Sequence, residues 1–363
     1  MLARLARNSL ALAAAVGLLA FAPIAKPFEH VVLVSVDGLR PECASATLAT
    51  AYPGLARLAR GPHTLAARCD PDISITLPNH LDMMTGRRVG GAEGHGWTHN
   101  DDPPGRRHGG TLEACHGAPV KTMFDVAHDR GLRTALIVGK WKFVLLEQTC
   151  GEEAGGPDTI APDDGRDKID LFACDPEPGA LVATTLSSLA VAVEGGKRSL
   201  TMLHFPNADF AGHLTGWDLT DGSPYRQAVS SIDGALQRLL AAIEADARLK
   251  GRVAIVLTAD HGGGVPFISH TDATAPVNFT IPFMVWVGGD GAPRDLYELN
   301  PTVRRKPAAS ERFAANAPPP IRNGDAGNLA LSLLGLPAIP GSTINASQDL
   351  VVEATASASA ATP

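Results

Sequence analysis

The stretch His30-Val-Val-Leu-Val-Ser-Val-Asp-Gly38 decides the predicted fold. An apolar, β-branched run that ends directly at Asp37 and Gly38 is typical of a strand buried on both faces of a sheet. Similar apolar runs occur at 134–138, 200–205, 253–258 and 283–287. Segments of helical period lie among them, at 122–129, 181–193, 229–243 and 328–334. This alternation predicts an α/β fold with a mostly parallel central sheet and helices on both faces.

The length and composition are those of a globular protein with a sizeable core. The chain has 363 residues, 45% of them hydrophobic, which suits one large domain. We expect residues 26–350 to form this single domain, with loop-rich insertions near 86–117 and 151–167. The segment 351–363 is rich in Ala, Ser and Thr, and we expect it to be a disordered tail.

The charge balance argues against a nucleic-acid partner. The formal net charge is −7, and Lys and Arg form no block along the chain. A nucleic-acid groove needs a basic stripe, so we expect none. A small anionic substrate would then need a local positive centre, such as a metal ion.

Residues 1–25 have the order of a secretory signal peptide. Arg4 and Arg7 precede the apolar run 10–22, and small residues follow up to Ala25. The run is short for a transmembrane helix, although an uncleaved anchor is the alternative. We therefore expect a periplasmic or secreted protein that has no stable membrane span after processing.

Two aspartates are predicted to share one edge of the sheet. Asp37 and Asp260 each follow the end of a predicted buried strand, and the carboxyl ends of parallel strands form the usual site of α/β proteins. His261 follows Asp260 directly. A strand-end aspartate is also common as a simple helix or turn cap, so each signal alone is weak.

A second group of candidate metal ligands comes from a predicted helix and a loop. Asp209 and His213 lie four residues apart, a spacing that points both side chains the same way on a helix. His270 follows in a loop. A surface ion pair and a loop histidine are the alternatives. Mixed carboxylate and imidazole ligands favour zinc over calcium or magnesium, while iron and manganese remain open.

The candidate nucleophile lies in the segment from Ile73 to His80. Pro78 as a first helical residue makes Thr76 or Leu77 the predicted helix cap. A hydroxyl there would face helix N–H groups that suit a phosphate, and a bound metal would lower its pKa. A plain cap is the alternative, and Ser74 is a rival nucleophile.

Five segments in this order resemble the alkaline phosphatase superfamily. They are VSVDG (34–38), TLPNHLDMMTG (76–86), NADFAGH (207–213), ADHGG (259–263) and a late Ser-His (269–270). They are most similar to the branch of nucleotide pyrophosphatases and type I phosphodiesterases. The resemblance spreads from about residue 31 to residue 270 and implies a metal-dependent hydrolase of phosphoesters.

The resemblance also implies roles for individual residues. It implies two zinc sites, one formed by Asp37, Thr76, Asp260 and His261 and the other by Asp209, His213 and His270. Thr76 would attack phosphorus and form a covalent phospho-threonine that is then hydrolysed. Asn100 matches an asparagine that donates to a nonbridging phosphoryl oxygen in this family.

Two lysines leave the substrate class open. Lys140 and Lys142 follow the predicted strand 134–138 at the same sheet edge. In related monoesterases and phosphonoacetate hydrolases, a basic pair at a similar place contacts substrate anions, and such point charges favour a monoester dianion. Solvated loop lysines are the alternative. The motifs favour a phosphodiesterase or nucleotide pyrophosphatase, and the lysines a phosphomonoesterase or phosphonoacetate hydrolase. A non-catalytic periplasmic anion-binding protein is a remote further reading.

Overall fold

A computed structural model of the protein describes residues 27–101, 110–163, 165–289, 291–313 and 317–352. The predicted signal peptide and most of the predicted tail therefore lie outside the described residues. Within these ranges, no helix combines the length and the apolar character needed to cross a lipid bilayer.

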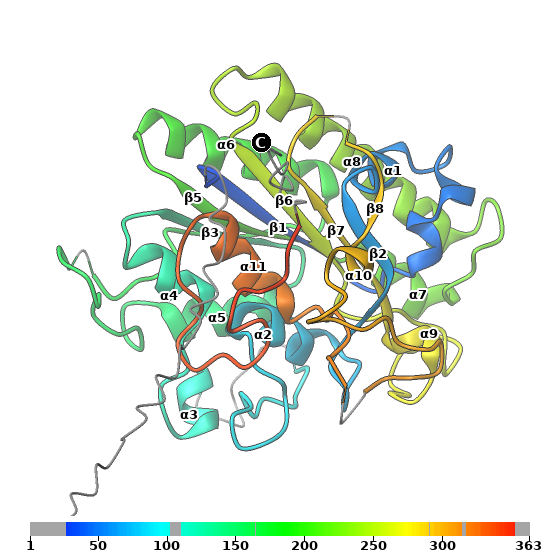
Figure 1. The fold of residues 1–363 in the computed structure, drawn as a ribbon, viewed down its shortest axis with the longest axis horizontal. Coiled ribbons are helices and arrows are strands. Elements are labelled where there is room, and N and C mark those ends of the chain that lie inside the picture. The colour runs from blue at the N-terminus through cyan, green and yellow to red at the C-terminus, as the bar shows by residue number, and fades with distance from the viewer. Residues whose placement is uncertain (1–26, 102–109, 164, 290, 314–316, 353–363) are drawn as a thin grey trace, which may run out of the picture.

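The described residues form an eight-stranded sheet in the order β4-β3-β5-β1-β6-β7-β2-β8 (Figure 1). The central strand β1 runs parallel to both neighbours, β5 and β6, while β7 runs antiparallel to β6 and β2. The bounds are β1 (His30–Val36), β2 (Pro62–Arg68), β3 (Arg133–Val138), β4 (Leu171–Cys174), β5 (Ser199–Phe205), β6 (Val253–Thr258), β7 (Thr280–Trp286) and β8 (Arg294–Asp295).

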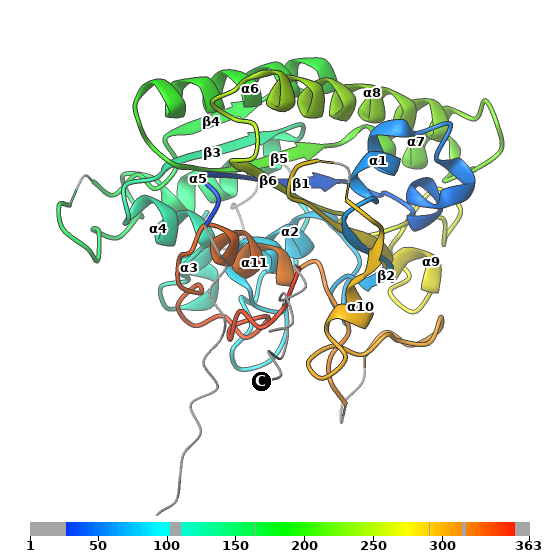
Figure 2. The same cartoon turned by 45° about the horizontal axis from the view of Figure 1, so that its top comes forward.

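Helices cover both faces of this sheet, as Figure 2 shows. One layer contains α1 (Pro53–Leu58), α6 (Pro178–Glu194), α7 (Asn207–Thr215) and α8 (Pro224–Ala245). The other contains α2 (Thr76–Thr85), α4 (Met123–His128), α5 (Val144–Cys150) and α11 (Asp325–Leu333). Shorter helices are α3 (Leu112–His116), α9 (Pro276–Phe279) and α10 (Leu296–Leu299), with 3-10 turns at Pro41–Ala44, Ala46–Leu48 and Trp141–Phe143. The predicted α/β fold with a mostly parallel, doubly covered sheet is confirmed.

Burial explains why these segments fold as they do. Every residue of β1, β5 and β6 is buried, as a strand covered on both faces requires. Helix α8 has one apolar face, and the residues on it are buried: Val229, Ile232, Leu236, Leu239 and Ile243.

The boundaries differ from the prediction in a few places. The run predicted at 283–287 forms β7 at Thr280–Trp286, and this strand is antiparallel. Helix α2 starts at Thr76 and not at Pro78, so Pro78 is its third residue. Strands β2, β4 and β8 were not predicted, because β2 contains Pro and Arg and the other two are short and partly exposed.

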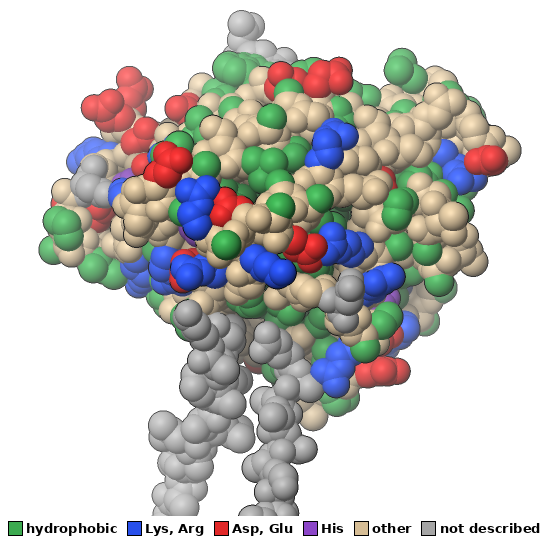
Figure 3. Space-filling model, turned by 90° about the horizontal axis from the view of Figure 1, so that it is seen from above, with side chains coloured by type: hydrophobic (Ala, Val, Ile, Leu, Met, Phe, Trp, Pro, Cys, Tyr) green, Lys and Arg blue, Asp and Glu red, His purple; other side chains and the backbone are tan. Residues whose placement is uncertain are grey.

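Surface charges are mixed on the face shown in Figure 3. Lys and Arg side chains lie among Asp and Glu side chains there, and a continuous basic stripe is not seen on this face.

One glycine fixes the turn that leaves the central strand. Gly38 has φ +69°, a conformation that disfavours other residues. A Cβ at this position would lie 3.1 Å from the Cα of Asp209 and 3.1 Å from Nε1 of Trp217. The Gly38 N–H also donates to Oδ1 of Asp260 at 3.1 Å. The turn therefore brings two aspartates close to the end of β1.

We expect Gly38→Ala to destabilise the protein more than Gly196→Ala. Gly196 has a similar φ of +64°, but a Cβ there would meet no atom within 4 Å. Both variants bear the cost of the left-handed backbone, about 1 kcal/mol, and Gly38→Ala adds at least about 1 kcal/mol of crowding. Urea unfolding measures both losses, and equal losses would contradict this role of Gly38.

Candidate metal centre

Three aspartates meet at the carboxyl edge of the sheet. Asp37 follows β1 directly, and Asp260 lies two residues beyond the end of β6, the parallel neighbour of β1. Asp209 lies on α7, which begins just beyond β5 on the other side of β1. All three side chains are buried. Adjacent parallel strands that end at one edge explain how residues far apart in the sequence converge.

The first cluster contains Asp37, Asp260 and His261. Nε2 of His261 lies 3.1 Å from Oδ2 of Asp260 and 3.5 Å from Oδ1 of Asp37. These three ligand atoms lie within 4.8 Å of one another, as the ligands of a single metal ion would. The family resemblance implies that these three residues form one site together with Thr76.

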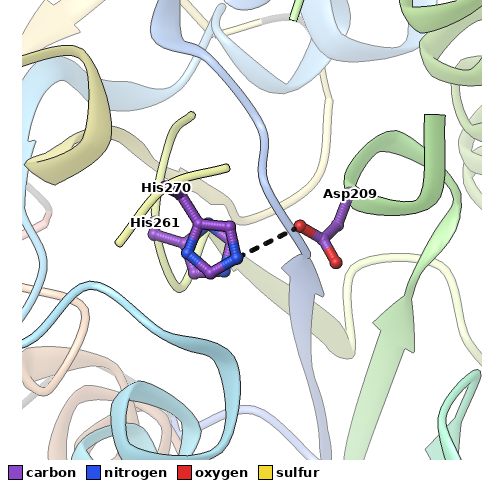
Figure 4. Close-up of side chains that lie close together, drawn as sticks. All are labelled: Asp209, His261 and His270. Atoms are coloured by element: carbon purple, nitrogen blue, oxygen red, sulfur yellow. Dashed lines mark ion pairs between the residues drawn. The ribbon is translucent and has the colours of Figure 1, made fainter. Parts of the chain in front are cut away.

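The second cluster contains Asp209, His213 and His270. Oδ1 of Asp209 lies 3.3 Å from Nε2 of His213 and 3.6 Å from Nε2 of His270. The two histidine Nε2 atoms are 3.2 Å apart. The His270 ring stacks on that of His261 with centroids 3.6 Å apart, and Figure 4 shows both rings facing Asp209. The two clusters are therefore adjacent.

The histidines are oriented as metal ligands usually are. Each has a backbone carbonyl beside Nδ1, so that Nδ1–H can donate and Nε2 keeps its lone pair for the cluster. The three bonds are His261 Nδ1 to Gly262 O (2.8 Å), His213 Nδ1 to Ile268 O (2.9 Å) and His270 Nδ1 to Ser74 O (2.5 Å).

Several buried polar atoms in the clusters make no hydrogen bond. They are Asp37 Oδ1, Asp209 Oδ1, Asp260 Oδ2 and His261 Nε2. The other Asp260 oxygen, in contrast, accepts from the N–H groups of Gly38 and His261. Buried polar groups without a partner are costly, and four such atoms come together in these two clusters. The donor set therefore fits metal ions.

Lys140 lies against both clusters. Its Nζ is 2.6 Å from Oδ2 of Asp37 and 2.6 Å from Oδ2 of Asp209. Three buried carboxylates and this ammonium leave two formal negative charges when the histidines are neutral. Divalent cations would compensate this charge. The sequence suggested Lys140 as a contact for substrate, and its pairing with two candidate ligands was not foreseen.

The pKa values reflect this excess of negative charge. Burial and the neighbouring Asp37 raise the pKa of Asp260 to about 6. Burial opposes protonation of His261, but the Asp260 carboxylate outweighs it and raises the pKa of His261 to about 9. Burial also acts to raise the pKa of Asp37, yet Lys140 and His204 hold it well below its usual range. In the absence of metal, a proton on His261 takes the place of a cation.

Sequence reasoning missed His204. Its Nδ1 accepts from the Gly139 N–H at 3.2 Å, so its Nε2–H donates to Oδ2 of Asp37 at 3.0 Å. This bond orients Asp37 and leaves its Oδ1 for the first cluster. The available signal was a polar residue within the apolar run of β5, paired in register with Ser35 of β1.

A pocket of about 510 Å³ opens beside the second cluster. Its lining brings together predicted residues from four segments: Thr76, Asn100, Lys140, Lys142, Asp209 and His213. The size suits a small molecule.

Helix α2 begins at Thr76, and its N-cap is Ile75, which makes no side-chain capping hydrogen bond. The prediction that Thr76 or Leu77 is the cap was therefore wrong. The Leu77 N–H donates to Oδ1 of Asn100 at 3.0 Å, and Pro78 has no N–H. The helix therefore offers fewer donors to a phosphate than the sequence suggested. The bond from Leu77 uses Oδ1 of Asn100 and leaves the Nδ2 amide group as its side-chain donor. Nζ of Lys142 donates to the Asn100 carbonyl at 3.1 Å.

Two solved structures illustrate the similarity in fold. A superfamily member from Vibrio parahaemolyticus has a TM-score of 0.54 and 14% identity, over 87% of this chain and 69% of that one. A lipoteichoic acid synthase from Listeria monocytogenes has a TM-score of 0.55 and 11% identity, over 89% and 74%. At these identities the likeness shows a shared fold.

A sequence family described as type I phosphodiesterase / nucleotide pyrophosphatase matches residues 31–272, about two thirds of the chain. The chain belongs to this family. It is also 31% identical over 125 residues to a 2,3-bisphosphoglycerate-independent phosphoglycerate mutase from Vibrio atlanticus. That match covers 33% of this chain and only 22% of the mutase.

We expect a rise in pH from 6.5 to 9 to destabilise the metal-free protein. A histidine whose pKa is about 9 in the fold and near 6.5 when unfolded contributes stability below pH 6.5 that is lost as the pH rises through 9. A metal on Nε2 of His261 would replace that proton. The free energy of unfolding measured in urea should therefore fall between pH 6.5 and 9 without metal, and it should fall less with zinc bound. Identical pH profiles would contradict the assignment of His261 as a ligand.

Proposed function

We propose that the protein is a phosphodiesterase or nucleotide pyrophosphatase-like hydrolase that acts through a covalent phospho-threonine at a site with two zinc ions. The observation that carries the proposal is a group of buried ligand atoms at one sheet edge that make no hydrogen bond: Asp37 Oδ1, Asp209 Oδ1, Asp260 Oδ2 and His261 Nε2. Asp37, Thr76, Asp260 and His261 would hold one ion, and Asp209, His213 and His270 the other. When bound, two such ions supply electrostatic stabilisation of the attacking and leaving oxygens.

Thr76 is the better nucleophile candidate of the two hydroxyl residues. It lines the pocket together with Asp209 and His213. The hydroxyl of Ser74 is buried and donates to the His270 carbonyl at 2.6 Å, so it holds the loop of the second cluster. Ser74 therefore supports the position of His270, and Thr76 remains to attack a substrate in the pocket.

The reaction then proceeds in two displacements. The Thr76 oxygen forms a bond to phosphorus as the bond to the leaving oxygen breaks, and the departing alcohol takes up a proton. Water next breaks the phosphorus–Thr76 bond, which releases the phosphoryl product and restores the hydroxyl. The Nδ2 group of Asn100 donates to a nonbridging oxygen in both steps.

Lys140 and Lys142 have different tasks in this proposal. Lys140 forms ion pairs with Asp37 and Asp209, so it neutralises part of the negative charge of the two clusters. It also lines the pocket. Lys142 lines the pocket and braces the carbonyl of Asn100. A lysine at this position favours a substrate with additional negative charge. For this reason a phosphomonoester or a phosphonate such as phosphonoacetate is the second candidate substrate.

We expect Thr76→Ala to lower kcat for bis-p-nitrophenyl phosphate by at least about a thousandfold, because the attacking oxygen is lost. Ser74→Ala is the matched control and should retain most of the rate when the metal content is unchanged. Steady-state kinetics with metal analysis of each variant measures this. A Thr76→Ala enzyme of undiminished rate would point to Ser74 or to direct attack by water, and a wild-type chain inactive on all esters would favour a binding protein.

We expect Lys142→Ala to reduce kcat/KM for p-nitrophenyl phosphate and phosphonoacetate about tenfold more than for bis-p-nitrophenyl phosphate. The reason is the extra charge of the monoester and of the carboxylate. A nucleotide pyrophosphate in the same panel establishes which class the wild type prefers. Equal losses on the diester and the monoester would contradict a charge-selective role of Lys142.

A further inference from the structure

Three apolar side chains line the pocket together with the candidate ligands and the two lysines. Trp141, Pro176 and Phe210 line the pocket that also contains Thr76. Trp141 is 52% exposed and Phe210 is 42% exposed, which is unusual for large aromatic residues in a folded protein. An ester whose phosphorus lay at Thr76 would have these three side chains within the same pocket for its organic group.

Neighbouring residues hold both aromatic rings in place. The Trp141 indole packs against Phe172 with ring centroids 5.7 Å apart and planes inclined by 62°. Nζ of Lys140 lies 5.2 Å from the centroid of the Phe210 ring, a cation–π contact. Both aromatic groups are thus positioned before a ligand binds, which lowers the entropic cost of binding.

Further exposed apolar side chains lie on α7 and near its end. Leu214 follows Phe210 by one helical turn on α7 and is 81% exposed. Phe267, 70% exposed, and Ile268 lie on the loop that leads to the second cluster. The Phe267 ring packs over the end of α7, where a Cβ on Gly216 would be 2.7 Å away. Exposed apolar groups near a pocket can extend its binding surface.

The polar groups of the pocket belong to its phosphoryl end. The described polar lining consists of Thr76, Asn100, Lys140, Lys142, Asp209 and His213, all assigned above to metal or phosphoryl contacts. A nucleobase stacked on Trp141 and Phe210 would have to bond its polar edge to water, because these side chains offer it no specific partner. An apolar group has no such requirement.

We propose that the organic group of the natural phosphoester is apolar, lies against Trp141 and Phe210, and extends towards Leu214 and Phe267 when it is long. The substrate class is thus an aryl or long-chain alkyl phosphoester. This inference rests on the proposed function for the position of the phosphoryl group.

Binding of non-hydrolysable phosphonates tests the proposal without turnover. Calorimetry on the zinc-loaded protein compares methylphosphonate, phenylphosphonate, octylphosphonate and uridine 5′-monophosphate. Phenyl- and octylphosphonate should bind at least about tenfold more tightly than methylphosphonate. Trp141→Ala and Phe210→Ala should each reduce that ratio several-fold. Val191→Ala, which removes a 46% exposed apolar side chain on α6, is the matched control and should leave the ratio unchanged.

Two results would overturn the inference: equal affinity for methyl-, phenyl- and octylphosphonate, or tighter binding of uridine 5′-monophosphate than of phenylphosphonate. Either result leaves ester hydrolysis by Thr76 intact. Conversely, a chain that hydrolyses no ester but keeps the phosphonate ratio refutes the proposed function alone.

Sedimentation with phosphatidylglycerol vesicles separates the two sources of an apolar ester. If the protein binds the vesicles and Leu214→Ala and Phe267→Ala weaken that binding, the apolar group belongs to a lipid. Phosphonate selectivity without vesicle binding assigns it to a soluble ester.

Discussion

The burial of three carboxylates at one sheet edge is the constraint on which the rest of the site depends. Nζ of Lys140 lies 2.6 Å from both Asp37 and Asp209, and Asp260 lies beside Asp37 in the first cluster. Like charges repel strongly when water is excluded, so this arrangement is stable only when cations or protons compensate it. The raised pKa values of Asp260 and His261 express this need, and two divalent ions would satisfy it.

The ligand-bearing segments are held together by the packing of glycines around one tryptophan, Trp217. Nε1 of Trp217 donates to the Gly38 carbonyl at 3.0 Å, beside the turn that carries Asp37. A Cβ on Gly212 or on Gly263 would lie within 2.4 Å of the Trp217 ring. The glycines next to the ligands in two separate motifs thus make room for the same side chain, which fixes α7 against the ends of β1 and β6.

The central strands and their terminal aspartates could be predicted from sequence, because a buried parallel strand has a distinctive apolar run and its end lies at a known sheet edge. Other features depend on register and packing. His204 lies in an apolar run and carries no local signal of its bond to Asp37. The pairing of Lys140 with two aspartates needs the order of β3, β5 and β1, which the sequence does not reveal. The true start of α2 was hidden because Pro78 suits the third helical position as well as the first.

Anomalous X-ray diffraction at the zinc edge, on crystals of the zinc-loaded protein, tests the central claim most directly. The account predicts two peaks, one among Asp37, Thr76, Asp260 and His261 and one among Asp209, His213 and His270. Their separation should be about 4 Å, as in two-metal sites that catalyse in-line displacement. An absence of peaks at these clusters, with Lys140 still bound to both aspartates, would contradict it.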